Sequence, residues 1–189
     1  MDWSRHPKIQ RTADLLWSGA VVAYPTEAVW GLGCAPHDEQ AVYRILALKQ
    51  RSMEKGLILV AASMDQFDFL LQPLTQKQRD TMAATWPGPY TWLVPDVEDQ
   101  VPDWIKGKFT SVALRVTDHP LVAGLCRAFG GPIVSTSANP QGLQPAMTNW
   151  QVRRYFGDSV DVITPGIVGG NTNPSEIRDL LTGQVVRSS

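Results

Sequence analysis

The chain has 189 residues, with 17 Lys and Arg against 18 Asp and Glu, which gives a formal net charge of −1. Overall charge therefore cannot attract a polyanion such as a nucleic acid, and any such binding would need a local basic patch. Its 43% apolar content is typical of a globular protein, and no stretch approaches the roughly 20 apolar residues of a membrane-spanning helix. The length predicts one domain over residues 1–189. Two distant cysteines and a start without an apolar segment favour the reducing cytoplasm.

Helix and strand signals alternate along the chain. Apolar side chains at helical spacing, with capping residues before them or glycines after them, predict helices, and short apolar runs predict buried strands. The predicted helices are 8–18, 38–51, two short ones that begin after Ser63 and Thr75, 120–130, and one from Thr148 to Gly157. The predicted strands are 20–24, 57–62, 90–94, 112–116, the run that begins at 132, 160–164, 175–179 and 184–187. This order predicts the α/β class, with a mixed sheet; residues 96–110 receive no assignment.

Two details of this prediction concern capping and the core. The three segments Ser63-x-x-Gln66, Thr75-x-x-Gln78 and Thr148-x-x-Gln151 match the capping box, in which two side chains satisfy the first backbone groups of a helix. Because large aromatic side chains dominate core burial, Trp17, Trp86 and Trp92 are expected in the core or in a pocket wall.

The segment 132–139 changes character within a few residues. It begins as the apolar run Pro132-Ile133-Val134 and continues as Ser135-Thr136-Ser137-Ala138-Asn139. Hydroxyl and amide groups at the end of a strand suit a ligand site, because open α/β sheets bind ligands there. The same residue types also suit a polar turn. Composition alone leaves both interpretations open.

Most familiar catalytic patterns are absent from the sequence. It contains no G-x-x-x-x-G-K-[ST] loop, and Gly31-x-Gly33-x-x-Pro36 lacks the third glycine of a dinucleotide fingerprint. The three histidines are scattered without ligand spacing, so no metal site is predicted. A hydrolase with Ser135 or Ser137 as nucleophile and His119 as base is disfavoured, because no G-x-S-x-G elbow is present.

The basic residues form the more informative pattern. Lys49, Arg51 and Lys55 follow one predicted helix, either as its solvated end or as part of a site. Arg115 lies within an apolar strand and needs an anionic partner, which is either an acid such as Asp118 or a ligand. If these cations converge with the hydroxyls, the pocket would suit a polyphosphate, since phosphoryl chemistry needs positioning, positive charge and usually Mg²⁺.

Several motifs together resemble the YrdC-domain family. They occur in the family's order over nearly the whole chain: Ala23-Tyr24-Pro25-Thr26-Glu27-Ala28-Val29-Trp30-Gly31-Leu32-Gly33, Lys49-Gln50-Arg51, Trp86-Pro87-Gly88-Pro89-Tyr90-Thr91, Leu114-Arg115-Val116, Ser135-Thr136-Ser137-Ala138-Asn139 and Asn173-Pro174-Ser175-Glu176-Ile177-Arg178-Asp179. Longer relatives carry Asn-Pro-Leu-Ile-x-His after K-x-R, whereas this chain has Lys55-Gly56-Leu57-Ile58-Leu59-Val60, as is typical of the short members. Val60 thus stands where those relatives have a histidine that contacts threonine.

The resemblance implies a twisted α/β sheet with a deep basic concave face. It also implies an enzyme that condenses L-threonine, bicarbonate and ATP into threonylcarbamoyl-AMP and pyrophosphate, for modification of the tRNA adenosine next to the anticodon. The residues that match the family's motifs receive roles by that likeness: Lys49 and Arg51 for catalysis and ATP phosphates, Ser135, Ser137, Asn139, Ser175 and Arg187 for ATP, and Thr26 and Arg115 for threonine.

The resemblance further implies Mg²⁺ bound with ATP, no protein-bound metal, no membrane, and downstream proteins of tRNA threonylcarbamoylation as partners. Binding of tRNA or double-stranded RNA is a related expectation. The alternative to catalysis is a double-stranded RNA-binding or ribosome-maturation factor, in which the same basic face would hold an RNA backbone. A synthase requires threonine and bicarbonate for ATP consumption, and an RNA binder does not.

Overall fold

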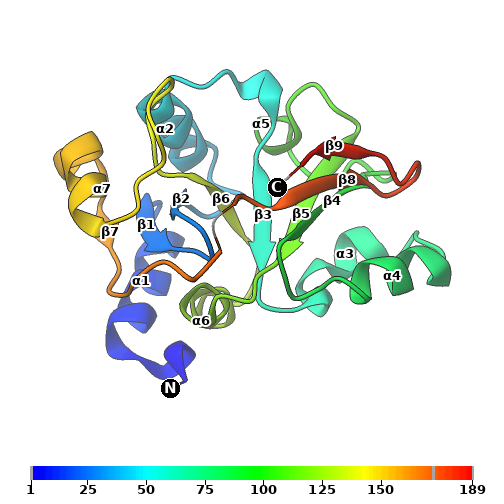
Figure 1. Ribbon diagram of the computed structural model, residues 1–189, viewed down its shortest axis with the longest axis horizontal. Helices are drawn as coiled ribbons and strands as arrows, with labels where there is room; N and C mark the ends of the chain where they lie inside the picture. The colour runs from blue at the N-terminus through cyan, green and yellow to red at the C-terminus, as the bar shows by residue number, and fades with distance from the viewer. Residues whose placement is uncertain (1, 172, 189) are drawn as a thin grey trace.

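The computed structural model describes residues 2–171 and 173–188. Its helices are α1 (Pro7–Trp17), α2 (Glu39–Lys49), α3 (Asp68–Leu71), α4 (Gln76–Ala83), α5 (Asp103–Lys106), α6 (Pro120–Phe129) and α7 (Asn149–Phe156), with 3₁₀ turns η1 (Trp3–Arg5), η2 (Met53–Lys55), η3 (Met64–Phe67) and η4 (Gly157–Ser159). Its strands are β1 (Val22–Pro25), β2 (Trp30–Gly33), β3 (Ile58–Ala61), β4 (Tyr90–Pro95), β5 (Ser111–Val116), β6 (Ile133–Ser137), β7 (Val162–Ile163), β8 (Glu176–Asp179) and β9 (Val185–Arg187). Helices and strands alternate (Figure 1), so the predicted α/β class is confirmed.

The described strands form one mixed sheet in the order β7-β1-β2-β6-β3-β5-β4-β8-β9. Strand β6 runs antiparallel to both of its neighbours, β2 and β3, and β3 runs parallel to β5. This order brings segments from all parts of the chain together: the β1–β2 turn, the end of β6 and the beginning of β8 all come from strands of the same sheet.

Alternate residues of the strands face two different hydrophobic cores. Ala23, Leu59 and Val134 pack with α2, α3, α4 and α7 on one face, and their neighbours Val60 and Ile133 pack with α1 and α6 on the other. This is the two-residue period of β-strands, in which successive side chains point to opposite sides. Figure 1 shows α1 and α6 together near the N-terminus, on the far side of the sheet from α2.

Local signals in the sequence account for most helix ends. The side chain of Asp38 accepts a hydrogen bond from the backbone N–H of Ala41, and Thr75 and Thr148 both form the predicted capping boxes. Pro120 occupies the first turn of α6, where its missing N–H costs nothing, and Gly130 ends that helix in the left-handed conformation with φ +87°. These predictions are confirmed.

The prediction of a capping box at Ser63 is wrong. Ser63 makes no side-chain cap, and the side chain of Gln66 instead accepts from the N–H of Ala62 and donates to the carbonyl of Cys126. The segment forms the turn η3 followed by one turn of α-helix, α3. The side chain of Gln66 therefore makes a tertiary contact with α6 instead of capping a helix at Ser63.

Two further expectations need correction. The short strand β2 was not predicted, and it pairs with β1 as a hairpin whose turn contains Thr26 and Glu27. Trp17 is 61% exposed rather than buried, and Trp30 of β2 is the fully buried tryptophan that the prediction omitted. Trp86 and Trp92 do lie in the core, as expected.

Residues 96–110 are packed against the domain. Lys106 is buried and makes ion pairs with Asp96, Asp99 and Asp103, and Ile105 is completely buried. The backbone N–H of Leu57 donates to the carbonyl of Ile105, which joins this segment to the beginning of β3. The segment therefore forms a fixed side of the sheet's open face.

Candidate active site

A cavity of about 380 Å³ lies on the face of the sheet that carries α1 and α6, beyond these two helices. Alternate residues of β5 and β6 form its floor. The β1–β2 turn, η2, the α5–β5 connection and β8 and β9 form its sides. Of the sequence-predicted site residues, those that line it are Thr26, Arg51, Arg115, Ser135, Ser137, Ser175 and Arg187.

Lys49 and Asn139 do not line the cavity but lie directly behind Ser137. The ammonium group of Lys49 donates to the backbone carbonyl of Ser137, to the carbonyl of Asn139 at 2.9 Å and to the Asn139 side-chain oxygen at 3.2 Å. Ser137 Oγ donates to the same side-chain oxygen at 2.6 Å. Lys49 therefore fixes the segment 137–139. Ser137 and Asn139 lie 88 and 90 positions from Lys49 in the sequence.

Burial changes the electrostatics of Lys49. The side chain is 5% exposed, and burial, together with the neighbouring positive charge of Arg51, lowers the pKa of Lys49 to about 8. Because burial disfavours the charged form of a lysine, the shift has the direction expected for an ammonium group whose acceptors among the described residues are neutral oxygen atoms.

Two guanidinium groups, those of Arg51 and Arg187, line the cavity, and the acceptors that they contact among the described residues are neutral. Arg51 Nη2 donates to the carbonyl of Gly56 at 2.9 Å, and Arg187 Nη2 donates to the carbonyl of Ser175 at 2.7 Å. Burial lowers the pKa of Arg51, and burial and the charges of Arg115 and Arg51 lower that of Arg187. The three arginines therefore act on one another and produce a positive potential that an anionic ligand would relieve.

Arg115 has the acidic partner that its place in an apolar strand requires. The partner is Glu27, at 3.0 Å between Nη2 and Oε2, and not Asp118, whose backbone N–H donates to Glu27 instead. Thr117 Oγ1 also donates to Glu27, at 2.7 Å. Sequence reasoning missed Glu27; the signal was the Pro-Thr-Glu step at a strand end opposite an arginine that needs an acid.

Thr26 and Ser175 add two hydroxyls to the lining of the cavity, and both residues are buried. Thr26 is 6% exposed, and its hydroxyl donates to the carbonyl of Val29 in the hairpin turn. Ser175 Oγ lies 2.8 Å from Thr91 Oγ1, so that the two hydroxyls share a hydrogen bond between β4 and the start of β8. The Thr26 hydroxyl, which donates to Val29, can still accept from a ligand, whereas Ser175 Oγ also accepts from Arg187 Nη2 at 3.4 Å.

The structure shows cavity-lining residues that were not assigned a role from the sequence, and it places His119 in another contact. Lys55, Phe109, Asn171 and Asn173 line the cavity. His119 Nε2 instead contacts the carbonyl of Ile167 at 3.1 Å, which gives no support to a serine–histidine pair.

The position that differs from the longer relatives is also outside the cavity. Val60 is completely buried in the core formed with α1 and α6, whereas Ile58, two residues earlier on the same face of β3, lines the cavity. A histidine at position 60 would therefore have to fit between the sheet and these helices.

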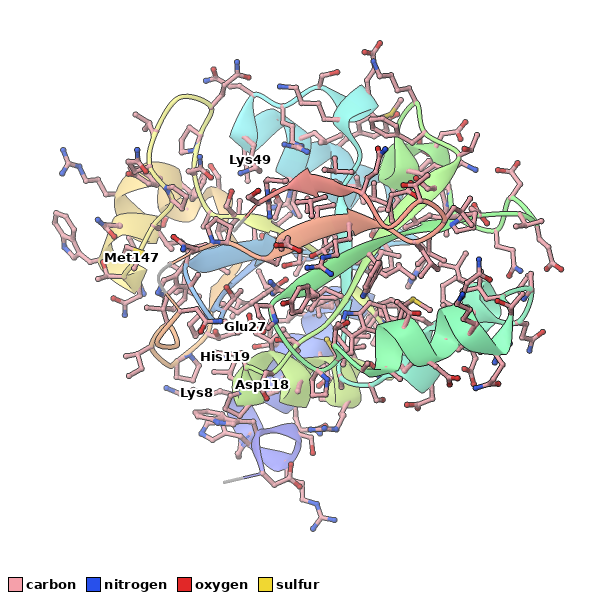
Figure 2. The ribbon with its side chains drawn as sticks, turned by 45° about the vertical axis from the view of Figure 1, so that its right-hand side comes forward. Lys8, Glu27, Lys49, Asp118, His119 and Met147 are labelled. Carbon is pink, nitrogen blue, oxygen red and sulfur yellow. The ribbon has the colours of Figure 1, made fainter. Side chains whose placement is uncertain are left out.

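Figure 2 shows how the labelled residues are distributed. Glu27, Asp118 and His119 lie together near α6, and Lys49 lies at the opposite side of the open face, at the end of α2. The site thus has two ends. One end carries Thr26, Glu27 and Arg115, and the other carries Lys49, Arg51 and the segment 137–139.

Within the described parts of the chain, no group of three or more His, Cys, Asp or Glu side chains could hold a metal ion. Across the same residues, the helices are too short or too polar to cross a bilayer.

A basic cavity of this size on one face of a twisted α/β sheet defines a class of protein that binds small anionic ligands. The sequence profile of the Sua5/YciO/YrdC family, described as telomere recombination, matches residues 14–189. The chain belongs to this family. It is 59% identical over 189 residues to a threonylcarbamoyl-AMP synthase from Cellvibrio japonicus, covering 100% of both chains, and 56% identical over 180 residues to one from Pseudomonas aeruginosa, covering 95% of this chain and 96% of that protein.

Solved structures agree with this assignment. Sua5 from P. abyssi in complex with L-threonine superposes with a TM-score of 0.86 at 31% identity, over 94% of this chain and 52% of that one. E. coli YciO superposes with a TM-score of 0.83 at 25% identity, over 95% of this chain and 88% of that one. The chain thus spans about half the length of Sua5 from P. abyssi and nearly the full length of YciO.

Proposed function

We propose that this protein is a threonylcarbamoyl-AMP synthase, which condenses L-threonine, bicarbonate and ATP and releases pyrophosphate. The observation that carries the proposal is that Arg51, Arg115 and Arg187 share one cavity of about 380 Å³ with the hydroxyls of Thr26 and Ser137. The full-length relatives from Cellvibrio and Pseudomonas bear the same activity in their names.

The two ends of the cavity suit two different substrates. Arg51, Lys55 and Arg187 supply three positive charges for the triphosphate, and Ser135, Ser137 and Ser175 supply hydrogen-bonding groups that orient it. At the other end, Thr26 and Arg115 would hold threonine, with the guanidinium of Arg115 next to the amino-acid carboxylate. The bound L-threonine of Sua5 from P. abyssi supports an amino-acid site in this fold.

The reaction follows from bringing these ligands together. The amine nitrogen of threonine forms a bond to the carbon of CO₂ and loses a proton to solvent, which gives an N-carboxylate. With bicarbonate as the source, a C–O bond of bicarbonate also breaks, and the departing hydroxide leaves with that proton as water. An oxygen of this carbamate then attacks the α-phosphorus of ATP, the bond from that phosphorus to the bridging oxygen breaks, and pyrophosphate leaves. Arg51 and Arg187 would stabilise the charge on the leaving group, and Lys49 would hold Ser137 in place beside it.

Mg²⁺ would enter on the nucleotide. Among the described residues that line the cavity, Glu27 is the one carboxylate, and it already accepts hydrogen bonds from Arg115, Thr117 and the N–H of Asp118. These residues therefore do not fit a protein-held magnesium ion, and the phosphates of ATP would be its ligands.

We also propose that the product feeds proteins that transfer the threonylcarbamoyl group to tRNA, in the cytoplasm. The alternative of an RNA-binding factor without catalysis receives less support from the cavity, because a concave pocket of a few hundred Å³ suits a small molecule and not an RNA helix. Affinity for RNA that falls steeply with salt, without any effect of threonine on ATP consumption, would favour the alternative.

The test measures pyrophosphate release with each substrate omitted in turn. We expect release only when ATP, threonine and bicarbonate are all present, and a loss of at least about 10²-fold in Arg51→Ala, since one charge-stabilising donor is commonly worth that much. Arg154→Ala, a change at an exposed arginine of α7, is the matched control and should retain the wild-type rate. Release from the wild-type protein that needs neither threonine nor bicarbonate would contradict the proposal.

A further inference from the structure

Glu27 is a buried carboxylate that accepts hydrogen bonds from three residues of the described chain. Its side chain is 11% exposed, and it accepts from Arg115 at 3.0 Å, from the Thr117 hydroxyl at 2.7 Å and from the N–H of Asp118 at 3.0 Å. Burial acts to raise the pKa of Glu27, but Arg115 and these hydrogen bonds outweigh it and lower the pKa. The group is therefore an anion at neutral pH, and its lowered pKa makes it a weak proton acceptor.

The backbone of Glu27 joins this carboxylate to another wall of the cavity. Its carbonyl accepts from the N–H of Asn171 at 3.1 Å, and the N–H of Gly169 donates to the neighbouring carbonyl of Thr26 at 2.9 Å. A Cβ on residue 169 would lie 2.8 Å from the Glu27 carbonyl oxygen, so only glycine permits this approach. Glu27 thus connects the hairpin turn, the end of β5 and the segment that leads to β8.

The charges along the cavity are distributed unevenly. Arg51 and Arg187 contact neutral carbonyl oxygens, whereas Arg115 contacts a carboxylate. Among the described lining residues, the anionic charge is therefore concentrated at one end, beside the guanidinium that would meet threonine. A polyphosphate gains most at the end where the arginines are not neutralised, and a zwitterion suits the end where a cation and an anion lie side by side.

We propose that Glu27 is a positioning and specificity-determining residue. It orients Arg115 toward the carboxylate of the amino acid. Its negative charge favours binding of a zwitterionic amino acid at that end of the cavity and disfavours binding of the triphosphate there. This inference rests on the proposed synthase function. Glu27 accepts from Nη2 of Arg115 at 3.0 Å, and this ion pair restricts the orientation of the guanidinium. The fixed negative charge repels a phosphate that would otherwise bind Arg115.

The test is the variant Glu27→Gln, which keeps the size of the side chain and removes its charge. We expect the KM for threonine to rise at least about tenfold, a change that corresponds to roughly 1.4 kcal/mol, while the KM for ATP stays the same or falls. Inorganic tripolyphosphate should compete with ATP alone in the wild-type protein, and with both ATP and threonine in the variant. A purely structural role for Glu27 would not produce this second competition.

Asp161→Asn is the matched control. Asp161 also accepts from an arginine, Arg44, and from a backbone N–H, that of Val21, but it lies beside β7 and away from the cavity. If it reproduces the effects of Glu27→Gln, or if Glu27→Gln leaves the threonine KM and the tripolyphosphate pattern unchanged, the inference is wrong.

A second variant covers the case in which Glu27→Gln does not fold. Thr117→Val removes one donor to Glu27 and leaves all charges in place, so it should raise the threonine KM several-fold without making tripolyphosphate a competitor of threonine. An unchanged threonine KM would then overturn the inference. Absence of threonylcarbamoyl-AMP from the wild-type reaction would instead overturn the proposed function itself, so the two failures are distinguishable.

Discussion

The ammonium group of Lys49 donates to the backbone carbonyl of Asn139 at 2.9 Å and to the side-chain oxygen of the same residue at 3.2 Å. Lys49 is the last residue of α2, and Asn139 follows β6, so this contact joins a helix to the strand segment that ends in the cavity. The cation would therefore act on a ligand in the cavity through the position of Ser137 and through its charge.

Replacing Lys49 by methionine keeps the aliphatic stem and removes the ammonium group. The carbonyl oxygens of Ser137 and Asn139 then lose a buried donor at a cost of about 1–3 kcal/mol, which opposes the gain in stability from removing a desolvated charge at neutral pH. Pyrophosphate release should fall by at least about 10²-fold, because the Ser137–Asn139 segment is no longer fixed and a positive charge is lost. Lys77→Met, on the exposed side of α4, should change neither urea unfolding nor activity.

The pH dependence of nucleotide binding should report the charge of Lys49. Burial and Arg51 lower the pKa of Lys49 to about 8 from its ordinary 10.5, so the affinity for a non-hydrolysable ATP analogue should fall as the pH rises through about 8. Lys49→Arg should move this decrease to higher pH, since arginine stays protonated. An affinity that is constant from about pH 7 to pH 9.5 would contradict the assignment of the charge.

Stability should respond to the same titration in the opposite direction. Between pH 8 and 10.5 the unfolded chain binds a proton at Lys49 that the folded chain has released, so this residue makes the protein more stable as the pH rises through that window. The Lys49 contribution is measured as the difference between the wild-type protein and Lys49→Met in urea unfolding at each pH. Weaker nucleotide binding at high pH would therefore not be caused by unfolding at this site.

Gly33 should tolerate no side chain. A Cβ at this position would lie 2.4 Å from the carbonyl oxygen of Val134 and 2.8 Å from the ring of Tyr24, whose hydroxyl donates to that carbonyl. Gly33→Ala should lower the free energy of unfolding by roughly 1–3 kcal/mol or more, because neither backbone nor buried ring can move away. Gly131→Ala, with nothing within 4 Å of the added carbon, should stay within about 0.5 kcal/mol of the wild type in the same thermal or urea measurement.

The elements with short-range signals were the predictable ones. Asp38, Thr75 and Thr148 cap helices through contacts three residues away, so the sequence around each contains all of the interacting groups. Strand β2 is four residues long and half glycine, and it is held by its partners β1 and β6. A strand that depends on its neighbours leaves no local pattern, and for the same reason Gln66 escaped its predicted capping box.

The site residues likewise divide into those that the sequence indicated and contacts that it did not. The residue types of Lys49, Arg51 and Ser137 indicated phosphate chemistry, and the resemblance of their motifs assigned them to one family. Spacing did not indicate that Lys49 lies behind Ser137, or that Glu27 is the partner of Arg115, because these pairs are separated by 88 positions each. The sheet order decides such contacts, and no segment of the sequence encodes it alone.

The strands that line the cavity come from both ends of the described chain. Thr26 and Glu27 lie in the first hairpin, and Arg187 lies in β9, whereas the last residue of the large hydrophobic core is Leu180. During translation, the core residues are therefore all available before the last cation of the cavity leaves the ribosome. Nucleotide binding should therefore be the final property that a nascent chain acquires. A messenger RNA truncated before the codon for Val185 would yield a protein that has its core but lacks Arg187.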